Sequence, residues 1–135
     1  MDQIHKDFVL IVDSLLQSDD VDEIKNCLDS IERHALEHFN TENKWMIESG
    51  FPAAQCHMEE HENVLASIRE VRADFDAQLA KDLGMALMDW FPGHADYLDS
   101  ALATWMVKQK FSAAPIVFRR NAIEVNESER QSVDC

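Results

Sequence analysis

Several histidines and a glutamate occupy positions where the periodicity of the sequence calls for apolar residues. His38 and Glu42 lie four residues apart, and so do His57 and His61. Residues four apart share one face of a helix, so each pair points the same way, into the core. Burial without partners would cost about 1–3 kcal/mol for each imidazole and more for the carboxylate. Neutral imidazole and carboxylate are both metal ligands, so a bound metal would remove this cost.

Two more histidines, in other segments of the chain, also lie on the apolar stripes of predicted helices. His5 shares a helix face with Phe8, and His94 follows Leu87 and Trp90 on the apolar stripe of a later helix. Five imidazoles with bridging carboxylates are more ligands than one ion accommodates, so the pattern predicts two ions. Nitrogen-rich ligand sets without thiolates favour iron, although zinc or manganese can also occupy them.

Four amphipathic helices are expected to position these side chains. The first covers residues 2–17, and the second ends at Gly50, which suits a left-handed helix cap. Pro52 can open the third helix. A turn near residues 74–76 precedes the fourth, whose stripe extends to Trp105. Long helices with short connections predict an all-α, up-down-up-down four-helix bundle.

The bundle is expected to form one domain at residues 1–110, followed by a tail or linker stub at residues 111–135. The chain has 135 residues, the size of a single domain. Its three Gly and three Pro are too few for a turn-rich β-sandwich. The segment after residue 110 becomes polar and loses its periodicity, which is typical of a short non-helical tail.

An excess of acidic residues limits the partners that the protein can have. The 26 Asp and Glu residues against 12 Lys and Arg give a net charge of −14. Nucleic acid and anionic membranes attract basic faces, so neither is expected as a partner. No apolar run approaches the ~20 residues of a membrane span. The first residues carry acids where an export signal has a basic region, so a cytoplasmic location is expected.

Three motifs resemble those of the hemerythrin family. Residues 38–61 read HFNTENKWMIESGFPAAQCHMEEH, similar to the family's HFxxE followed by a Met, a Gly-Tyr/Phe-Pro turn and HxxxH. Residues 2–6, DQIHK, resemble its first histidine motif, and residues 89–99, DWFPGHADYLD, resemble its last. The resemblance spans residues 2 to about 105, in the family's order and spacing.

The resemblance implies a non-haem di-iron, O2-binding four-helix bundle close to the bacterial hemerythrins. It implies that three histidines bind the first iron: His57, His61 and His94. It implies that two bind the second iron, which keeps one position open for O2: His5 and His38. An oxo or hydroxo group and two carboxylates would bridge the irons: Glu42 and Asp99.

The choice of Asp99 comes from the family pattern, because spacing alone would also allow Asp96. His94 and Asp99 are five residues apart, about 140° around an ideal α-helix. A π-bulge between them would bring the two side chains into line. Pro92 and Gly93 directly precede His94, and Pro removes a helix hydrogen bond, so a kink or a restart of the helix is expected there.

Other residues are expected to surround the ligands. His34 falls one residue short of a stripe position, which places it either next to the ligands or at a solvated rim. Asn43 stands where the family commonly has a second acid and is expected to affect only the surface. An apolar wall would keep water from the site, and four residues are candidates for it: Phe8, Phe39, Trp90 and Leu98.

The function implied is reversible O2 binding at one open iron position, and NO and small anions are further candidate ligands. The protein would act as an O2 carrier or as an O2- or redox-sensing input domain. A fused or associated signalling output domain, such as a cyclic-di-GMP synthase, would be the partner of a sensor. We expect no enzyme, beyond weak redox activity of the di-iron site.

Two alternatives remain open at this point. The same di-iron site could belong to a redox enzyme, such as a peroxidase or a protein that handles nitric oxide. A zinc hydrolase is the more remote alternative, because residues 57–61 also match HxxEH, whose Glu is catalytic in zinc proteases. That reading would leave the ligands on the other helices without a role.

Overall fold

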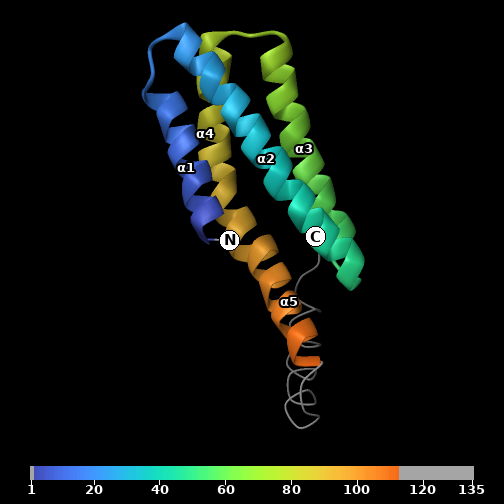
Figure 1. Cartoon of the computed structure of the whole chain (residues 1–135). Coiled ribbons are helices and arrows are strands. Elements are labelled where there is room, and N and C mark those ends of the chain that lie inside the picture. Colours follow the sequence, from blue (N-terminus) through green and yellow to red (C-terminus); the bar gives the residue numbers. More distant parts are fainter. Residues whose placement is uncertain (1, 113–135) are drawn as a thin grey trace.

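The computed structural model describes residues 2–112 (Figure 1). All regular elements of this part of the chain are helical, and it contains no strand. In chain order the elements are α1 (Asp2–Gln17), α2 (Val21–Ser49), α3 (Ala54–Ala73), α4 (Ala77–Gly93), the π-helix η1 (His94–Asp99) and α5 (Ser100–Ser112). The prediction of an all-α fold is confirmed.

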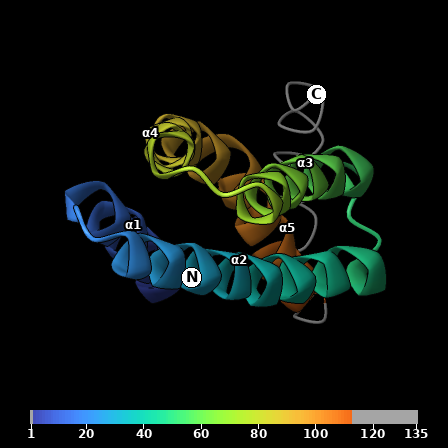
Figure 2. The same ribbon diagram turned by 90° about the horizontal axis from the view of Figure 1, so that it is seen from above.

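The helices pack side by side around a common interior. α1 contacts α2 and α4, and α3 likewise contacts α2 and α4. Seen from above, these four helices surround the interior, and α5 continues below them (Figure 2). A four-helix bundle fits this arrangement, with α4, η1 and α5 forming one uninterrupted helical side.

The predicted breaks between helices are present, and each carries a helix cap. Asp20 accepts a hydrogen bond from the backbone N–H of Asp22 at the start of α2, and Asp76 accepts one from that of Leu79 at the start of α4. Gly50 ends α2 with φ 68°, a left-handed conformation that glycine adopts without strain. Pro52, expected to open α3, lies instead in the turn before it, because α3 begins at Ala54.

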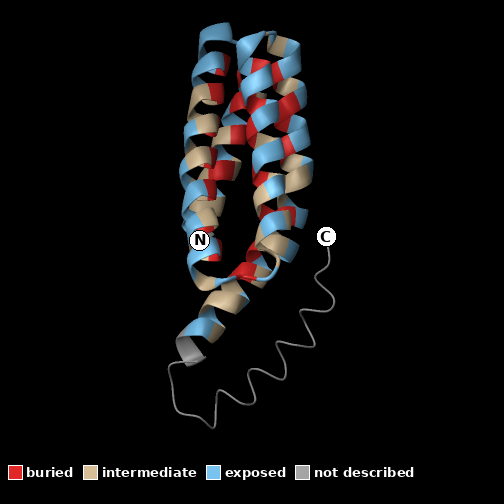
Figure 3. Ribbon diagram, turned by 90° about the vertical axis from the view of Figure 1, so that its right-hand side faces the viewer, coloured by how far each residue is buried: buried red, intermediate tan, exposed pale blue. Residues whose placement is uncertain are grey.

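Buried residues lie on the inner faces of the helices (Figure 3). Their side chains form two apolar clusters with polar residues between them. Along α2, Phe39 belongs to the larger cluster and Met46 to the smaller one. Glu42 lies between them and is fully buried. Along α3, His57 and His61 are buried in the same way before Leu65 of the larger cluster. The polar layer is therefore enclosed by apolar packing on both sides.

The restart of the helix after Pro92 does not occur. α4 continues through Pro92 to Gly93, and η1 follows at once. The backbone N–H of Ser100 donates to the carbonyl of Ala95, the five-residue spacing of a π-helix. Of the two expected alternatives, a kink or a restart, the restart is therefore absent, and the π-bulge that would align His94 with Asp99 is present.

The end of the chain is described only in part. α5 extends to Ser112, past the domain boundary predicted at residue 110. The rest of the predicted tail, residues 113–135, lies outside the described residues. Within residues 2–112, no helix combines the length and the apolar character that crossing a membrane requires.

Candidate metal centre

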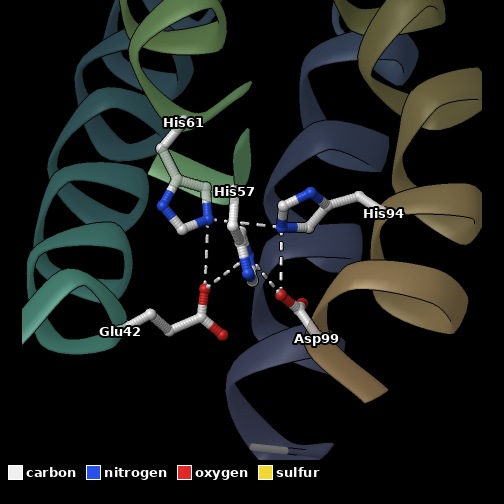
Figure 4. A group of neighbouring side chains, drawn as sticks. All are labelled: Glu42, His57, His61, His94 and Asp99. Atoms are coloured by element: carbon white, nitrogen blue, oxygen red, sulfur yellow. Dashed lines mark hydrogen bonds and ion pairs between the residues drawn. The ribbon is translucent and has the colours of Figure 1, made fainter. Parts of the chain in front are cut away.

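Seven side chains bring their ligand atoms together inside the bundle, in two groups that share one carboxylate. The ligand atoms of the first group lie within 4.8 Å of one another (Figure 4): Glu42, His57, His61, His94 and Asp99. Those of the second group meet the same limit: His5, His38 and Asp99. Every residue that the sequence predicted as a ligand belongs to one of these two groups.

The π-helix explains how His94 and Asp99 reach the same point. Their ligand atoms, Nε2 and Oδ1, are 3.0 Å apart. Residues five apart diverge on an α-helix, but the wider turn of a π-helix places them one above the other. Asp96, the alternative that spacing left open, is exposed. The geometry therefore supports Asp99 as the ligand.

Asp99 divides its two carboxylate oxygens between the groups. Oδ1 lies 3.1 Å from Nε2 of His57 and 3.0 Å from Nε2 of His94. Oδ2 lies 3.0 Å from Nε2 of His5. This is the arrangement that a carboxylate bridging two ions requires.

Glu42 divides its oxygens in the same way. Oε1 lies 3.1 Å from Nε2 of His61 and 3.6 Å from Nε2 of His57. Oε2 lies 3.5 Å from Nε2 of His38, in the second group. Two carboxylates from different helices therefore each present one oxygen to each group.

The residues fit a metal because their buried polar atoms lack other partners. Both carboxylate oxygens of Glu42 and of Asp99 are buried without a hydrogen bond, and so is Nε2 of His57. The same holds for Nε2 of His5 and of His38. Leaving a buried polar group unsatisfied costs about 1–3 kcal/mol, and these atoms converge. A cation in each group would satisfy their lone pairs.

Burial and the neighbouring charges move the pKa values of these groups in opposite directions. Burial lowers the pKa of His57, but the Asp99 and Glu42 carboxylates outweigh this and raise it to about 9. Burial raises the pKa of Asp99, yet His57 and His94 hold it well below its ordinary value. Glu42 likewise has a lowered pKa, because His57 and His61 outweigh its burial. Both carboxylates are therefore ionised at neutral pH, as bridging ligands must be.

Two other histidines of the site are neutral and ready to bind a cation. Burial lowers the pKa of His38 and that of His61 below the ordinary imidazole value. A neutral imidazole offers a lone pair, whereas a protonated one offers none. His57, with its raised pKa, must instead give up a proton to bind a metal at neutral pH.

Two polar residues that the sequence reasoning did not assign orient the histidines of the first group. Nδ1 of His61 lies 2.9 Å from Oδ1 of Asn43, so the expectation that Asn43 affects only the surface is wrong. Nδ1 of His94 lies 3.0 Å from Oε1 of Glu60. An amide or carboxylate oxygen only accepts, so each Nδ1 carries the proton and each Nε2 keeps its lone pair for the interior.

The expected apolar wall is present in part. Phe39 stacks on His61, with ring centroids 3.9 Å apart, and Trp90 lies against His94 at 4.4 Å. Phe8 is buried but packs against Phe91 rather than against a ligand ring. Phe91, which was not predicted, meets the ring of His5 edge-on at 5.2 Å. Aromatic rings therefore border both groups.

The remaining two predicted neighbours lie farther out. His34 is half-buried and belongs to neither group, with its ring 6.1 Å from Phe8 and 6.5 Å from His38. It therefore takes the position next to the ligands rather than at a solvated rim. Leu98, expected in the wall, is half-buried within η1.

Comparison with known proteins agrees with this geometry. The sequence model of the hemerythrin family, described as the hemerythrin HHE cation binding domain, matches residues 1–106. A bacteriohemerythrin from Ralstonia nicotianae is 36% identical to the chain over 111 residues, which cover 80% of this chain and 80% of that protein. No solved structure matches the chain. The chain belongs to the hemerythrin family.

Proposed function

We propose that this chain is a non-haem di-iron protein that binds O2 reversibly. The observation that carries the proposal is the division of both bridging carboxylates, Glu42 and Asp99, between two groups of histidines. A site for a single ion would not need two carboxylates whose two oxygens each face a different group of histidines. A pair of ferrous ions, when bound, supplies the electrons for reversible binding of O2. Membership of the hemerythrin family and the bacteriohemerythrin relative support this assignment.

The two groups would hold their ions with different numbers of histidines. Three histidines would hold the first iron: His57, His61 and His94. Two would hold the second, so its protein ligand set is smaller and leaves room for O2: His5 and His38. The side chains of His5 and His38 are 19% and 9% exposed, whereas those of the first group's histidines are at most 1% exposed. We place O2 binding at the second site, because it has fewer ligands and lies nearer the surface.

Binding fits the surroundings of the second site better than catalysis does. Phe91 meets His5, and Phe39 lies beside His38, so apolar rings pack against both ligands, and the half-buried His34 lies beside His38. Such rings exclude the water and protons that would drive irreversible oxidation. NO and small anions would compete with O2 for the same position. The protein would therefore serve as an O2 carrier or as the input domain of an O2 or redox sensor.

The position of Glu60 argues against the zinc-hydrolase alternative. Its carboxylate contacts Nδ1 of His94, whereas a metal would be held by Nε2 on the opposite side of the ring. A general base must lie within hydrogen-bond reach of the water that it activates. Glu60 therefore faces the back of a ligand and not the reacting position.

The helices are proposed to alternate in direction, up-down-up-down. α2 has 29 residues and is therefore about 43 Å long. The connections at residues 18–20, 50–53 and 74–76 span no more than about 14 Å when fully extended. Such connections are too short to return the chain to the far end of the bundle, so successive helices would run in opposite directions. A cytoplasmic location, expected from the sequence, is part of the same proposal.

Iron content and a visible spectrum under changing O2 test the proposed function. The protein is purified with iron, the iron per chain is counted, and spectra are recorded reduced, in air and again under vacuum. We expect about two irons per chain and an absorption band that appears in air and is lost when O2 is removed. Irreversible oxidation within seconds would contradict reversible binding and support the redox enzyme or a redox sensor.

A further inference from the structure

Glu60 contacts two residues of the adjacent helical segment formed by α4 and η1: Trp90 and His94. It lies on α3, and its Oε1 accepts a hydrogen bond from Nε1–H of Trp90 at 2.6 Å. The same oxygen accepts one from Nδ1–H of His94 at 3.0 Å. The side chain of Glu60 is 35% exposed, while that of His94 is 1% exposed. The contact therefore runs from the surface of α3 to the back of a buried ligand.

We infer that Glu60 is a positioning residue for the first metal site, which deepens the function proposed above and rests on it. Its carboxylate holds the imidazole of His94 with Nδ1 protonated, so that Nε2 presents its lone pair to the ion. The negative charge on the outer N–H also makes the imidazole a stronger donor to the metal. Glu60 thus acts on the ion through His94 and does not touch it.

The three histidines of the first group differ in the hydrogen-bond partner of their outer nitrogen, Nδ1. Nδ1 of His94 meets a carboxylate, Nδ1 of His61 meets the neutral amide of Asn43, and Nδ1 of His57 has no hydrogen bond. Hydrogen bonds to an ionised acceptor are roughly twice as strong as neutral ones. His94 is therefore the ligand whose orientation and donor strength depend most on a residue outside the ligand set.

Trp90 completes the arrangement by holding the carboxylate in place. Its N–H donates to the same oxygen that His94 uses, and its ring lies against the His94 ring with centroids 4.4 Å apart. A half-exposed glutamate without this donor would be free to turn toward solvent. The indole N–H of Trp90 is consequently a direct reporter of the Glu60 contact.

The test compares Glu60→Ala and Glu60→Gln with Glu59→Gln. Glu59 is the adjacent, exposed acid, and its Oε1 accepts a hydrogen bond from Gln55 of the same helix, so its substitution removes the same charge one residue away. Zinc affinity is measured by competition with a chelator, and the indole N–H resonance of Trp90 is followed by NMR with and without zinc.

We expect Glu60→Ala to bind zinc about 10–100-fold more weakly than the unsubstituted protein. Glu60→Gln should show a smaller loss, because its amide oxygen still accepts a hydrogen bond but carries no charge. Glu59→Gln should leave the affinity unchanged. The Trp90 resonance should move in both Glu60 variants and stay in place in Glu59→Gln.

Equal zinc affinity in Glu60→Ala and Glu59→Gln would overturn the inference while leaving the proposed function intact. If the unsubstituted protein itself binds no zinc and no iron, the proposed metal site fails instead. Circular dichroism checks that each variant is helical. Should Glu60→Ala not fold, Glu60→Gln decides: an affinity and a Trp90 resonance equal to those of Glu59→Gln would also overturn the inference.

Discussion

His57 is the residue at which both buried carboxylates of the site meet. Its Nε2 lies 3.1 Å from Oδ1 of Asp99 and 3.6 Å from Oε1 of Glu42. The two negative charges raise its pKa to about 9 in spite of its burial. At neutral pH a proton therefore occupies the place that a cation would take, and the site stays partly neutralised before metal arrives.

Metal binding near pH 7.5 should accordingly release about one proton per chain from His57. Imidazoles with lowered pKa values, such as His38 and His61, are already neutral at this pH and should release none. Calorimetry of zinc binding in buffers of different ionisation enthalpy counts the released protons. A count near zero at pH 7.5 would show that His57 is neutral before metal binds.

His38 tests the second site directly, because it belongs to the second group and not to the first. His38→Ala should reduce the iron content from about two per chain to about one, since the second ion loses one of its two histidines. His34→Ala is the matched control, because His34 lies one turn away on α2 and belongs to neither group. Iron analysis that finds equal content in the two variants would remove His38 from the ligand set.

The seven candidate ligands could be predicted from the sequence because each is a polar residue on an apolar stripe or matches a family motif. Burial makes such a residue costly, and the cost points to a compensating partner. Asn43 and Glu60 carried no such signal. Both are only half-buried, and a polar residue on a half-buried face of a helix needs no explanation. Only the folded structure shows that they contact the outer nitrogens of His61 and His94.

At the scale of the element, η1 is the feature that periodicity alone could not place. The stripe that predicts α4 follows the 3.6-residue period of the α-helix, and that period separates His94 from Asp99. The end of α2 was predictable from Gly50, because capping is a local property of a few residues. The turn at residues 74–76 was predicted from helix length rather than from the cap at Asp76. Whether a π-helix forms depends on the contacts that its side chains make with other helices, and such contacts leave no period in the sequence. Only the family pattern therefore indicated η1.

The packing of α4 on α1 yields a stability prediction at Gly84. A Cβ at this position would lie 2.9 Å from Cδ2 of Leu16 and 3.0 Å from Cδ2 of Leu15. A Cβ at Gly93 would meet nothing within 4 Å. Both glycines are helical, so replacement by alanine changes the helix propensity equally, by about 1 kcal/mol in favour of the helix.

Gly84→Ala should therefore be less stable than Gly93→Ala by about 1–3 kcal/mol, because only the former crowds the contact between α1 and α4. Urea unfolding of the two metal-free variants measures the difference directly. Equal free energies of unfolding would mean that Leu15 and Leu16 yield without cost, and that α1 and α4 are less tightly packed than the structure shows.

At the scale of the whole molecule, the site ties together the helices that surround it. α1 contributes His5, α2 contributes His38 and Glu42, α3 contributes His57 and His61, and η1 contributes the rest. Among the described residues, the only buried acids are Glu42 and Asp99, so the acid surplus of the chain lies mainly outside the core. Metal ions at this point would act as a cross-link between helices, and metal removal should lower the free energy of unfolding.

The metal-free protein should also lose stability as the pH falls from 7 to 5. Burial keeps the pKa values of His34, His38 and His61 below the ordinary value of 6.5 in the folded state. Below pH 6.5 the unfolded chain therefore binds protons that the folded chain does not, and the free energy of unfolding falls with pH. His57 opposes this slope, because its raised pKa keeps it protonated in the folded state while the unfolded imidazole takes up its proton only as the pH falls through about 6.5.

Glu42 and Asp99, with lowered pKa values, extend the loss of stability to more acid pH. Their ionised forms stabilise the folded state above the ordinary carboxyl pKa, and this contribution disappears as they take up protons below about pH 4. Urea unfolding at pH 7 and pH 5 should show a loss of roughly 1–3 kcal/mol without metal. The double variant His38→Leu, His61→Leu should lose less over the same range, because two of the three responsible groups are gone. A free energy of unfolding that stays constant from pH 7 to pH 5 in the unsubstituted protein would mean that its buried imidazoles take up protons as readily when folded as when unfolded.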